Sequence, residues 1–169
     1  PRVGLLNVGT EDTKGGELQH QAFALLKKAG EEGRINFIGN VEGTDVFAGK
    51  AEVVVTDGFT GNVLLKTTEG VIKFMMGALK GVFYKNTVNK LAAAVLKSDL
   101  KEMKKSMDVN EVGGTALIGI SKPVIKAHGS SNAASLFAAV RQAVAFVDSG
   151  LIGDINDNIE YMKIKGEQA

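Results

Sequence analysis

The stretch that decides the fold is AEVVVTDGFTGN, residues 51–62. Its run from Val53 to Val55 is apolar and β-branched, which is typical of a buried strand. Asp57 and Gly58 follow this strand, and a helix is expected from Thr60 onward. A strand that leads through a short glycine-containing turn into a helix is the repeating unit of a parallel α/β fold.

Two segments upstream show the same pattern. Residues 3–8 and 35–38 are apolar runs that end in Gly9 and in Gly39-Asn40, and both predict strands. Between them, helical spacing predicts a helix over residues 17–29, and a shorter helix or turn is expected near residues 44–48. Strands that alternate with helices indicate a parallel sheet with both faces covered.

The downstream region has a longer helical period. Ile72, Met76, Leu79 and Phe83 are spaced by four, three and four residues, and the set Leu96, Leu100, Met103 and Met107 repeats that spacing. This predicts a hairpin of two long amphipathic helices, residues 60–83 and 87–107. Strands over 116–120 and 124–127 and a helix over 133–147 should follow, with at most one weak helix after Gly150.

Composition limits the function classes. The 169 residues suffice for a compact domain, and the absence of cysteine excludes a disulfide scaffold, a cysteine zinc site and a cysteine nucleophile. With only His20 and His128 as histidines, a metal site is not supported. The patterns Gly-x-Gly-x-x-Gly and Gly-x-Ser-x-Gly do not occur, so a dinucleotide fingerprint and a nucleophile elbow are missing. No apolar run reaches the length of a membrane span.

Charge is unevenly distributed. The net charge is +1, yet residues 71–107 contain eight lysines and two acids, which gives this segment +6 and the remainder −5. The basic helices would suit a dimer contact, an acidic carrier protein or an anionic lipid surface. A helix pair packed on its own core with a solvated lysine face is the simplest interpretation, and periodicity alone favours it.

Three loops carry candidate site residues, since ligands of open α/β sheets bind beyond the carboxyl ends of the strands. The first loop, residues 7–16, contains Lys14, which would neutralise a phosphate or an oxyanion unless it is only a solvated lysine. In the second loop, residues 56–62, Gly58 and Gly61 would let the backbone approach an anion. Thr60 and Asn62 add hydrogen-bonding side chains there, and the alternative is a helix cap made by Asp57 or Thr60.

The third loop, residues 127–132, again joins a strand to a helix. His128 would hydrogen-bond phosphate or move a proton, and Ser130 and Ser131 would add hydroxyl groups. The alternative is a structural histidine with Ser131 or Asn132 as the helix N-cap.

Taken together, these loops resemble those of the PlsX-type phosphate acyltransferases. The resemblance rests on residues 36–43, 51–63 and 123–132, supported by residues 1–9 and by Lys14-Gly15-x-Glu17-Leu18. It extends in order from residue 1 to about residue 147. Several of these motifs are long, so the resemblance is specific.

The resemblance implies a three-layer α/β/α sandwich like that of the isocitrate and isopropylmalate dehydrogenases. Residues 1–169 would be the C-terminal part of a single catalytic domain whose N-terminal half is absent, and the helical hairpin, residues 60–107, would protrude from it. The resemblance also implies a homodimer. The protein would be cytoplasmic and would associate peripherally with anionic membrane, with the hairpin tip as the expected contact.

The implied reaction transfers an acyl chain from acyl carrier protein to inorganic phosphate, for phospholipid synthesis, without a metal or nucleotide cofactor and without a nucleic-acid partner. The resemblance assigns catalysis to Lys14 and Asn62. The phosphate pocket would be formed by Asp57, Gly58, Thr60, Gly61, His128, Ser130 and Ser131. Two alternatives remain: a phosphate acetyl- or butyryltransferase that uses a coenzyme A thioester, and a non-catalytic module that binds a membrane or a partner protein.

Overall fold

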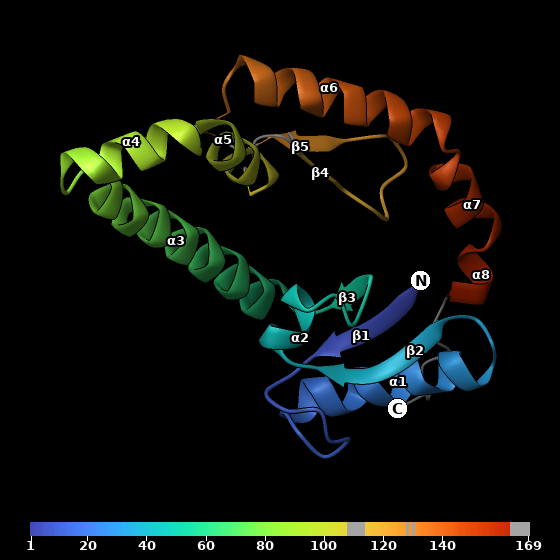
Figure 1. The fold of residues 1–169 in the computed structure, drawn as a ribbon. Coiled ribbons are helices and arrows are strands. Elements are labelled where there is room, and N and C mark those ends of the chain that lie inside the picture. Colours follow the sequence, from blue (N-terminus) through green and yellow to red (C-terminus); the bar gives the residue numbers. More distant parts are fainter. Residues whose placement is uncertain (108–113, 128, 130, 163–169) are drawn as a thin grey trace. The chain divides into compact units, whose positions relative to one another are not determined.

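The computed structural model describes residues 1–107, 114–127, 129 and 131–162. The chain divides into two compact units, Pro1–Gly81 and Val82–Ala169. Helices accompany a small sheet in each unit, so the mixed α/β class predicted from the sequence is confirmed (Figure 1).

The first unit is organised around a parallel sheet with the strand order β2-β1-β3. The central strand β1 (Arg2–Leu6) pairs with β2 (Asn36–Val41) on one side and with β3 (Val53–Val55) on the other. Val3, Leu5 and Leu6 of β1 are buried, as expected for the middle strand of a covered sheet. The parallel arrangement predicted from the alternating pattern is therefore present.

Helices flank this sheet. Figure 1 shows α1 (Glu17–Glu31) lying along one face of the sheet, where the Phe23 ring meets Phe37 of β2 edge to face, with centroids 5.4 Å apart. The short helix α2 (Gly43–Phe47) follows β2, and the long helix α3 (Gly58–Phe83) follows β3. Each strand of the sheet is thus followed by a helix. Because the strands are parallel, the loops that connect them to these helices all lie at the carboxyl ends of the strands.

A bulge interrupts β2. Val3 lies opposite Phe37, but Leu5 lies opposite Asn40, so β2 has one more residue than β1 across this interval. Gly39 provides the bend with a φ of 91°, a region that side-chain-bearing residues avoid. Beyond the bulge Asn40 and Val41 are both buried although they are adjacent in sequence.

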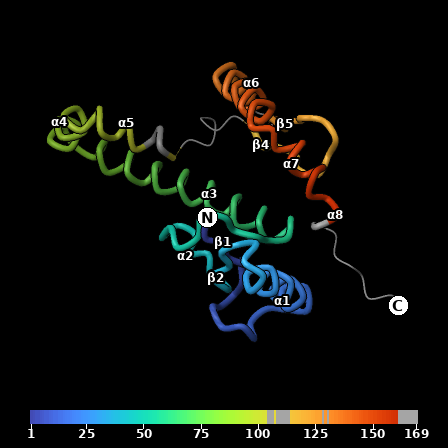
Figure 2. The backbone as a smooth tube through the Cα atoms, turned by 90° about the vertical axis from the view of Figure 1, so that its right-hand side faces the viewer, coloured from blue at the N-terminus to red at the C-terminus, as the bar shows by residue number. Residues whose placement is uncertain are grey.

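The second unit contains α4 (Thr87–Val95), α5 (Lys97–Ser106) and the antiparallel pair β4 (Gly114–Ala116) and β5 (Ile125–Ala127). Helix α6 (Ala133–Asp148) packs on this pair and buries Ser135, Ala138, Ala139 and Phe146 (Figure 2). Two short helices, α7 (Leu151–Asp157) and α8 (Ile159–Met162), complete the unit.

Several boundaries differ from those predicted. The helix expected over 87–107 is divided at Leu96, whose ψ of 7° departs from helical geometry just before Ser98 and Asp99, residues that compete for backbone hydrogen bonds. The strand expected over 116–120 is wrong except at Ala116, because β4 covers Gly114–Ala116 and Gly119 has a φ of 86°, which a regular strand does not adopt. The single weak helix expected after Gly150 is wrong, because α7 and α8 both form there.

Candidate functional site

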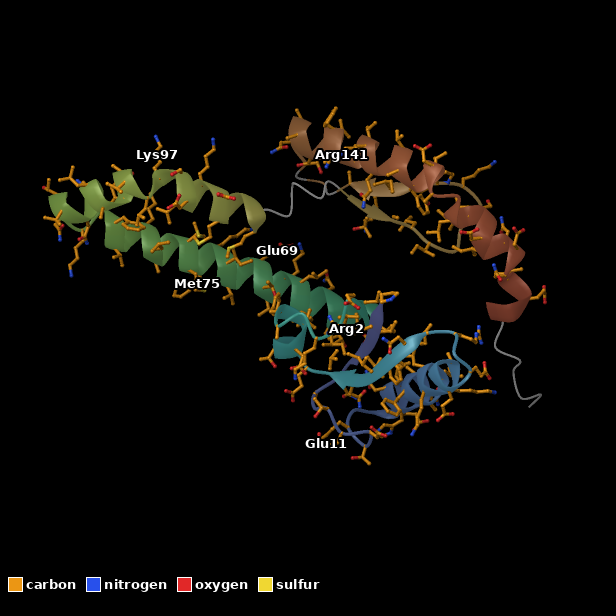
Figure 3. The ribbon with its side chains drawn as sticks, turned by 45° about the vertical axis from the view of Figure 1, so that its right-hand side comes forward. Arg2, Glu11, Glu69, Met75, Lys97 and Arg141 are labelled. Carbon is orange, nitrogen blue, oxygen red and sulfur yellow. The ribbon has the colours of Figure 1, made fainter. Side chains whose placement is uncertain are left out.

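The parallel sheet brings the first and second loops to the same edge. The first loop leaves β1 and the second loop leaves β3, and these strands are hydrogen-bonded neighbours with Leu5 opposite Val55. The bases of the two loops are therefore about 4.8 Å apart, the spacing of adjacent strands. At the opposite end of β1, Arg2 pairs with Glu52 at 2.9 Å and joins the starts of β1 and β3. Figure 3 labels Arg2 and Glu11 toward these two ends.

The first loop is closed by backbone-directed hydrogen bonds. Asn7 donates its backbone N–H to the Val41 carbonyl at 2.9 Å and its side-chain Nδ2 to the Lys14 carbonyl at 2.9 Å. The Lys14 N–H donates to the Glu11 carbonyl at 3.1 Å. On the α1 side, the His20 ring nitrogen lies 3.1 Å from the Thr13 carbonyl. The loop is thus tied to the end of β2 and to α1.

Lys14 lies in this closed loop with its side chain exposed. Its Cγ and Cε pass over Gly9, where an added Cβ would lie 2.9 and 3.1 Å from them. Lys14 Nζ has no hydrogen-bond or ion-pair partner among the residues that the structure describes. A cation without a protein partner at the carboxyl edge of a parallel sheet is suited to an anionic ligand.

In the second loop, Asp57 caps the N-terminus of α3. Asp57 Oδ1 accepts from the Thr60 N–H at 2.8 Å, and Asp57 Oδ2 accepts from the Thr60 hydroxyl at 2.6 Å. The hydrogen bond from the Thr60 hydroxyl is the main reason that the pKa of Asp57 lies below its usual range, and the hydrogen bond from the Thr60 N–H is the second. The capping alternative considered for Asp57 and Thr60 therefore describes what these two residues do in this structure.

Gly61 has a packing reason to be glycine. A Cβ at this position would lie 2.7 Å from the Thr56 methyl group, much closer than ordinary contact. Gly58 differs, since a Cβ there would meet nothing within 4 Å. Asn62 lies in the second turn of α3 and is exposed. The helix α3 follows β3 and the Lys14 loop follows the neighbouring strand β1, so both residues come from segments at the carboxyl ends of adjacent strands.

The third loop belongs to the second unit. Asn132 caps α6 by accepting from the Ser135 N–H at 2.9 Å and the Ser135 hydroxyl at 3.0 Å. Ser131 precedes this cap and is partly buried. His128 and Ser130 lie outside the described residues, so the roles predicted for them remain predictions.

Two asparagines at strand ends were not singled out by the sequence. Asn7 closes the first loop, and Asn40 is 6% exposed with its Nδ2 2.8 Å from the Glu11 carbonyl. Both lie just where β1 and β2 end, so a search for polar residues at strand termini would have found them.

Among the described residues, no group of three or more histidine, aspartate or glutamate side chains is arranged to hold a metal ion. No single helix in the described part of the chain is long and apolar enough to cross a membrane, although α6 and α7 together, with a bend of 43°, meet the length and composition of a broken span.

Known proteins resemble this chain over most of its length. The family model described as "fatty acid synthesis protein" matches residues 1–153. A phosphate acyltransferase of Lysinibacillus sphaericus (strain C3-41) is 48% identical over 97% of this chain and 48% of its own length. Those of Geobacillus thermodenitrificans (strain NG80-2) and Bacillus cereus (strain B4264) are both 53% identical over 95% of this chain and cover 48% and 47% of their own lengths.

The chain spans about half the length of the curated relatives it matches. The resemblance to phosphate acyltransferases inferred from the three loops is confirmed at the level of the family. With nine-tenths of its residues matched by one family model, the chain belongs to the fatty acid synthesis protein family.

Proposed function

We propose that the protein containing this chain transfers an acyl group from the thioester of acyl carrier protein to inorganic phosphate, which yields an acyl-phosphate for phospholipid synthesis. The curated relatives are named phosphate acyltransferases, and the family is one of fatty acid synthesis. The observation that carries the proposal is the exposed Lys14 ammonium, held on a closed loop beside the second loop at the carboxyl edge of the sheet.

The chemistry needs positive charge and hydrogen-bond donors. A phosphate oxygen attacks the thioester carbonyl carbon, the C–O bond forms, and the carbonyl oxygen becomes an oxyanion. Collapse of this intermediate breaks the C–S bond, and the departing thiolate takes up the proton released by phosphate. Both phosphate and the oxyanion are negative, so a fixed cation beside them lowers the barrier more than one that must be ordered during the reaction.

Lys14 and Asn62 take these roles in the proposal. The Asp57 carboxylate already accepts the Thr60 N–H at the start of α3 and would repel a second anion there. We therefore place the phosphate next to Lys14, with Asn62 donating to the oxyanion. Gly58 and Gly61, which lie at the start of α3 in the same unit as Lys14, would border the pocket.

The proposal extends to fold and assembly. Together with further residues of a longer protein, the parallel sheet would form the three-layer sandwich of the isocitrate dehydrogenase type, in a cytoplasmic homodimer. Peripheral membrane contact would involve the basic helices, and α4 offers an apolar stripe for it: Val88, Leu91 and Val95 lie on one face and are 73%, 66% and 80% exposed. Lysines at positions 85, 90 and 97 would meet anionic headgroups.

The test of the active site compares Lys14→Ala with Lys28→Ala in the full-length protein. Lys28 is an exposed lysine in the last turn of α1 and serves as the matched control. Acyl-phosphate formation from acyl-acyl carrier protein and phosphate should fall about 100-fold or more in kcat for Lys14→Ala, the loss typical of removing an oxyanion partner. A rise in the phosphate KM at constant kcat would instead assign Lys14 to ground-state phosphate binding. Full activity of Lys14→Ala would refute its assignment.

The donor is tested by supplying the same acyl group on coenzyme A. The proposal expects a clear preference in kcat/KM for the carrier-protein thioester, because the basic helices complement an acidic carrier. Equal or better use of the coenzyme A thioester would favour the alternative transferase class.

The membrane contact is tested with Leu91→Gln, which makes the stripe on α4 polar without adding charge. Binding to vesicles rich in phosphatidylglycerol should weaken, whereas Leu18→Gln, the same change at a 59% exposed leucine of α1, should bind as the unchanged protein does. Equal binding of both variants would argue against α4 as the contact.

A further inference from the structure

The backbone N–H and the backbone carbonyl of Lys14 are both hydrogen-bonded, and asparagines from two strand ends take part in this network. The Glu11 carbonyl accepts two donors, the Lys14 N–H at 3.1 Å and Asn40 Nδ2 at 2.8 Å. The Lys14 carbonyl accepts Asn7 Nδ2 at 2.9 Å. Asn40 belongs to the end of β2 and Asn7 follows the end of β1, so each asparagine connects the first loop to a different strand.

The side chain of Lys14 is also guided. Gly9 is buried beneath it, and the aliphatic part of the lysine passes over the place where a Cβ would lie. With the backbone fixed by the two asparagines and the stem resting on Gly9, the ammonium is the part left free for a ligand. A cation held in this way is preorganised, which is what stabilisation of a developing negative charge requires.

Asn40 is unusual as a core residue. It is 6% exposed, and its Oδ1 is buried without a hydrogen-bond partner among the described residues. An unsatisfied buried oxygen destabilises a fold, and an apolar side chain of similar size would not carry that penalty. The bulge at Gly39 nevertheless leaves Asn40 in this buried position at the strand end. Its amide is therefore explained by what it donates to, the Glu11 carbonyl beside Lys14.

We infer that Asn40, with Asn7, is a positioning residue that acts through Lys14, holding the loop so that the Lys14 ammonium faces the reacting anions. This inference rests on the proposed function, since it requires Lys14 to take part in the reaction. Asn40 itself does not touch substrate.

The test is a double-variant cycle in the full-length protein: Asn40→Ala, Lys14→Ala and the two combined. The kcat is measured at saturating substrate, with enough enzyme that slow variants remain measurable. Asn40→Ala should lower kcat about 10-fold or more while Lys14 is present, because a displaced catalytic group loses rate steeply. In the Lys14→Ala background the same change should alter kcat by less than about twofold.

Two further variants separate positioning from folding. Asn40→Leu keeps the branched shape of the side chain, although leucine is larger, and it removes the unsatisfied oxygen. It should therefore destabilise the fold no more than Asn40→Ala does and still lose kcat. Asp45→Ala alters another buried polar residue, 7% exposed, which bonds Lys50 and the Glu42 N–H and not the first loop. It should lower stability with little change in kcat.

The outcomes distinguish the two proposals. Equal losses from Asn40→Ala in both backgrounds, or full kcat in Asn40→Leu, would overturn the positioning role while leaving Lys14 catalytic. Full activity of Lys14→Ala would overturn the catalytic role of Lys14 and the positioning role with it.

Discussion

Replacing Gly61 with alanine should destabilise the first unit, although alanine is the better helix former. Gly61 lies in the first turns of α3, and a Cβ added there would stand 2.7 Å from Thr56 Cγ2. Contacts of 3.4–4 Å are ordinary, so the two groups must separate by about 1 Å. The Thr56 hydroxyl donates to the Asp57 carbonyl at 3.2 Å, which restrains the threonine against turning away.

The magnitude follows from two opposed effects. Exchange of glycine for alanine inside a helix is worth about 1 kcal/mol in favour of alanine. Forcing an extra carbon into an occupied space costs about 1–3 kcal/mol. The net change in the free energy of unfolding should therefore be a loss of about 1 kcal/mol. At Gly58, where nothing lies within 4 Å, the same substitution meets no such clash and should be neutral or stabilising.

The assay is urea unfolding of Gly61→Ala, of Gly58→Ala and of Gly61→Ala combined with Thr56→Ser. Serine lacks the Cγ2 methyl group, so the combined variant should recover the lost stability relative to Thr56→Ser alone. Equal free energies for Gly61→Ala and Gly58→Ala would refute the packing explanation. Unchanged stability with a raised phosphate KM would instead mean that Gly61 is small to admit a ligand.

Three other predictions each concern the role of a single residue in stability. Thr60 lowers the pKa of Asp57 in the folded protein, so the ionised cap stabilises the fold at pH values above the ordinary pKa of aspartate. This stabilisation is lost as the pH falls through the lowered pKa of the folded state. In urea titrations, the free energy of unfolding should exceed that of Asp57→Asn at neutral pH, and the difference should shrink below about pH 4. Gly39→Ala, at a φ of 91° with open space around it, should cost about 1–2 kcal/mol from backbone strain alone, while Gly43→Ala, 3.6 Å from Leu64 and without positive φ, should cost less. Asn132→Ala should destabilise α6 by about 1 kcal/mol, seen as faster amide exchange at Ser135, and unchanged exchange would contradict the cap.

The strands of the first unit could be predicted because apolar and β-branched runs favour extended backbone. The apolar runs before Gly9 and Gly39 and the Val53–Val55 run are β1, β2 and β3. Full burial did not follow from the pattern, since Ile38 of β2 and Val53 of β3 are 39% and 42% exposed. The bulge at Gly39 was not predictable in the same way, because register depends on which residue of the neighbouring strand is opposite. The division of the helix at Leu96 likewise depends on backbone geometry that apolar spacing does not determine.

The site was predicted in part. Lys14 could be singled out as a loop cation, and the capping alternative for Asp57 and Thr60 was visible as a residue pattern. Asn7 and Asn40 could not be recognised as supports for Lys14, because their hydrogen bonds to carbonyls at Lys14 and Glu11 depend on tertiary distances. The reason for Gly61 was equally hidden, since Thr56 is five residues earlier and meets it only once β3 turns into α3.

The bulge in β2 also bears on how copies of this chain meet one another. Among the described residues β2 and β3 are the outer strands of the parallel sheet, and outer strands offer unpaired backbone groups to any passing strand. A regular six-residue outer strand could pair along its whole length with a strand of another copy. In β2, however, the extra residue at Gly39 interrupts the regular spacing of backbone hydrogen-bonding groups, and β3 is only three residues long. Growth of aggregates by strand addition is therefore hindered at both margins, and straightening β2 would remove that protection.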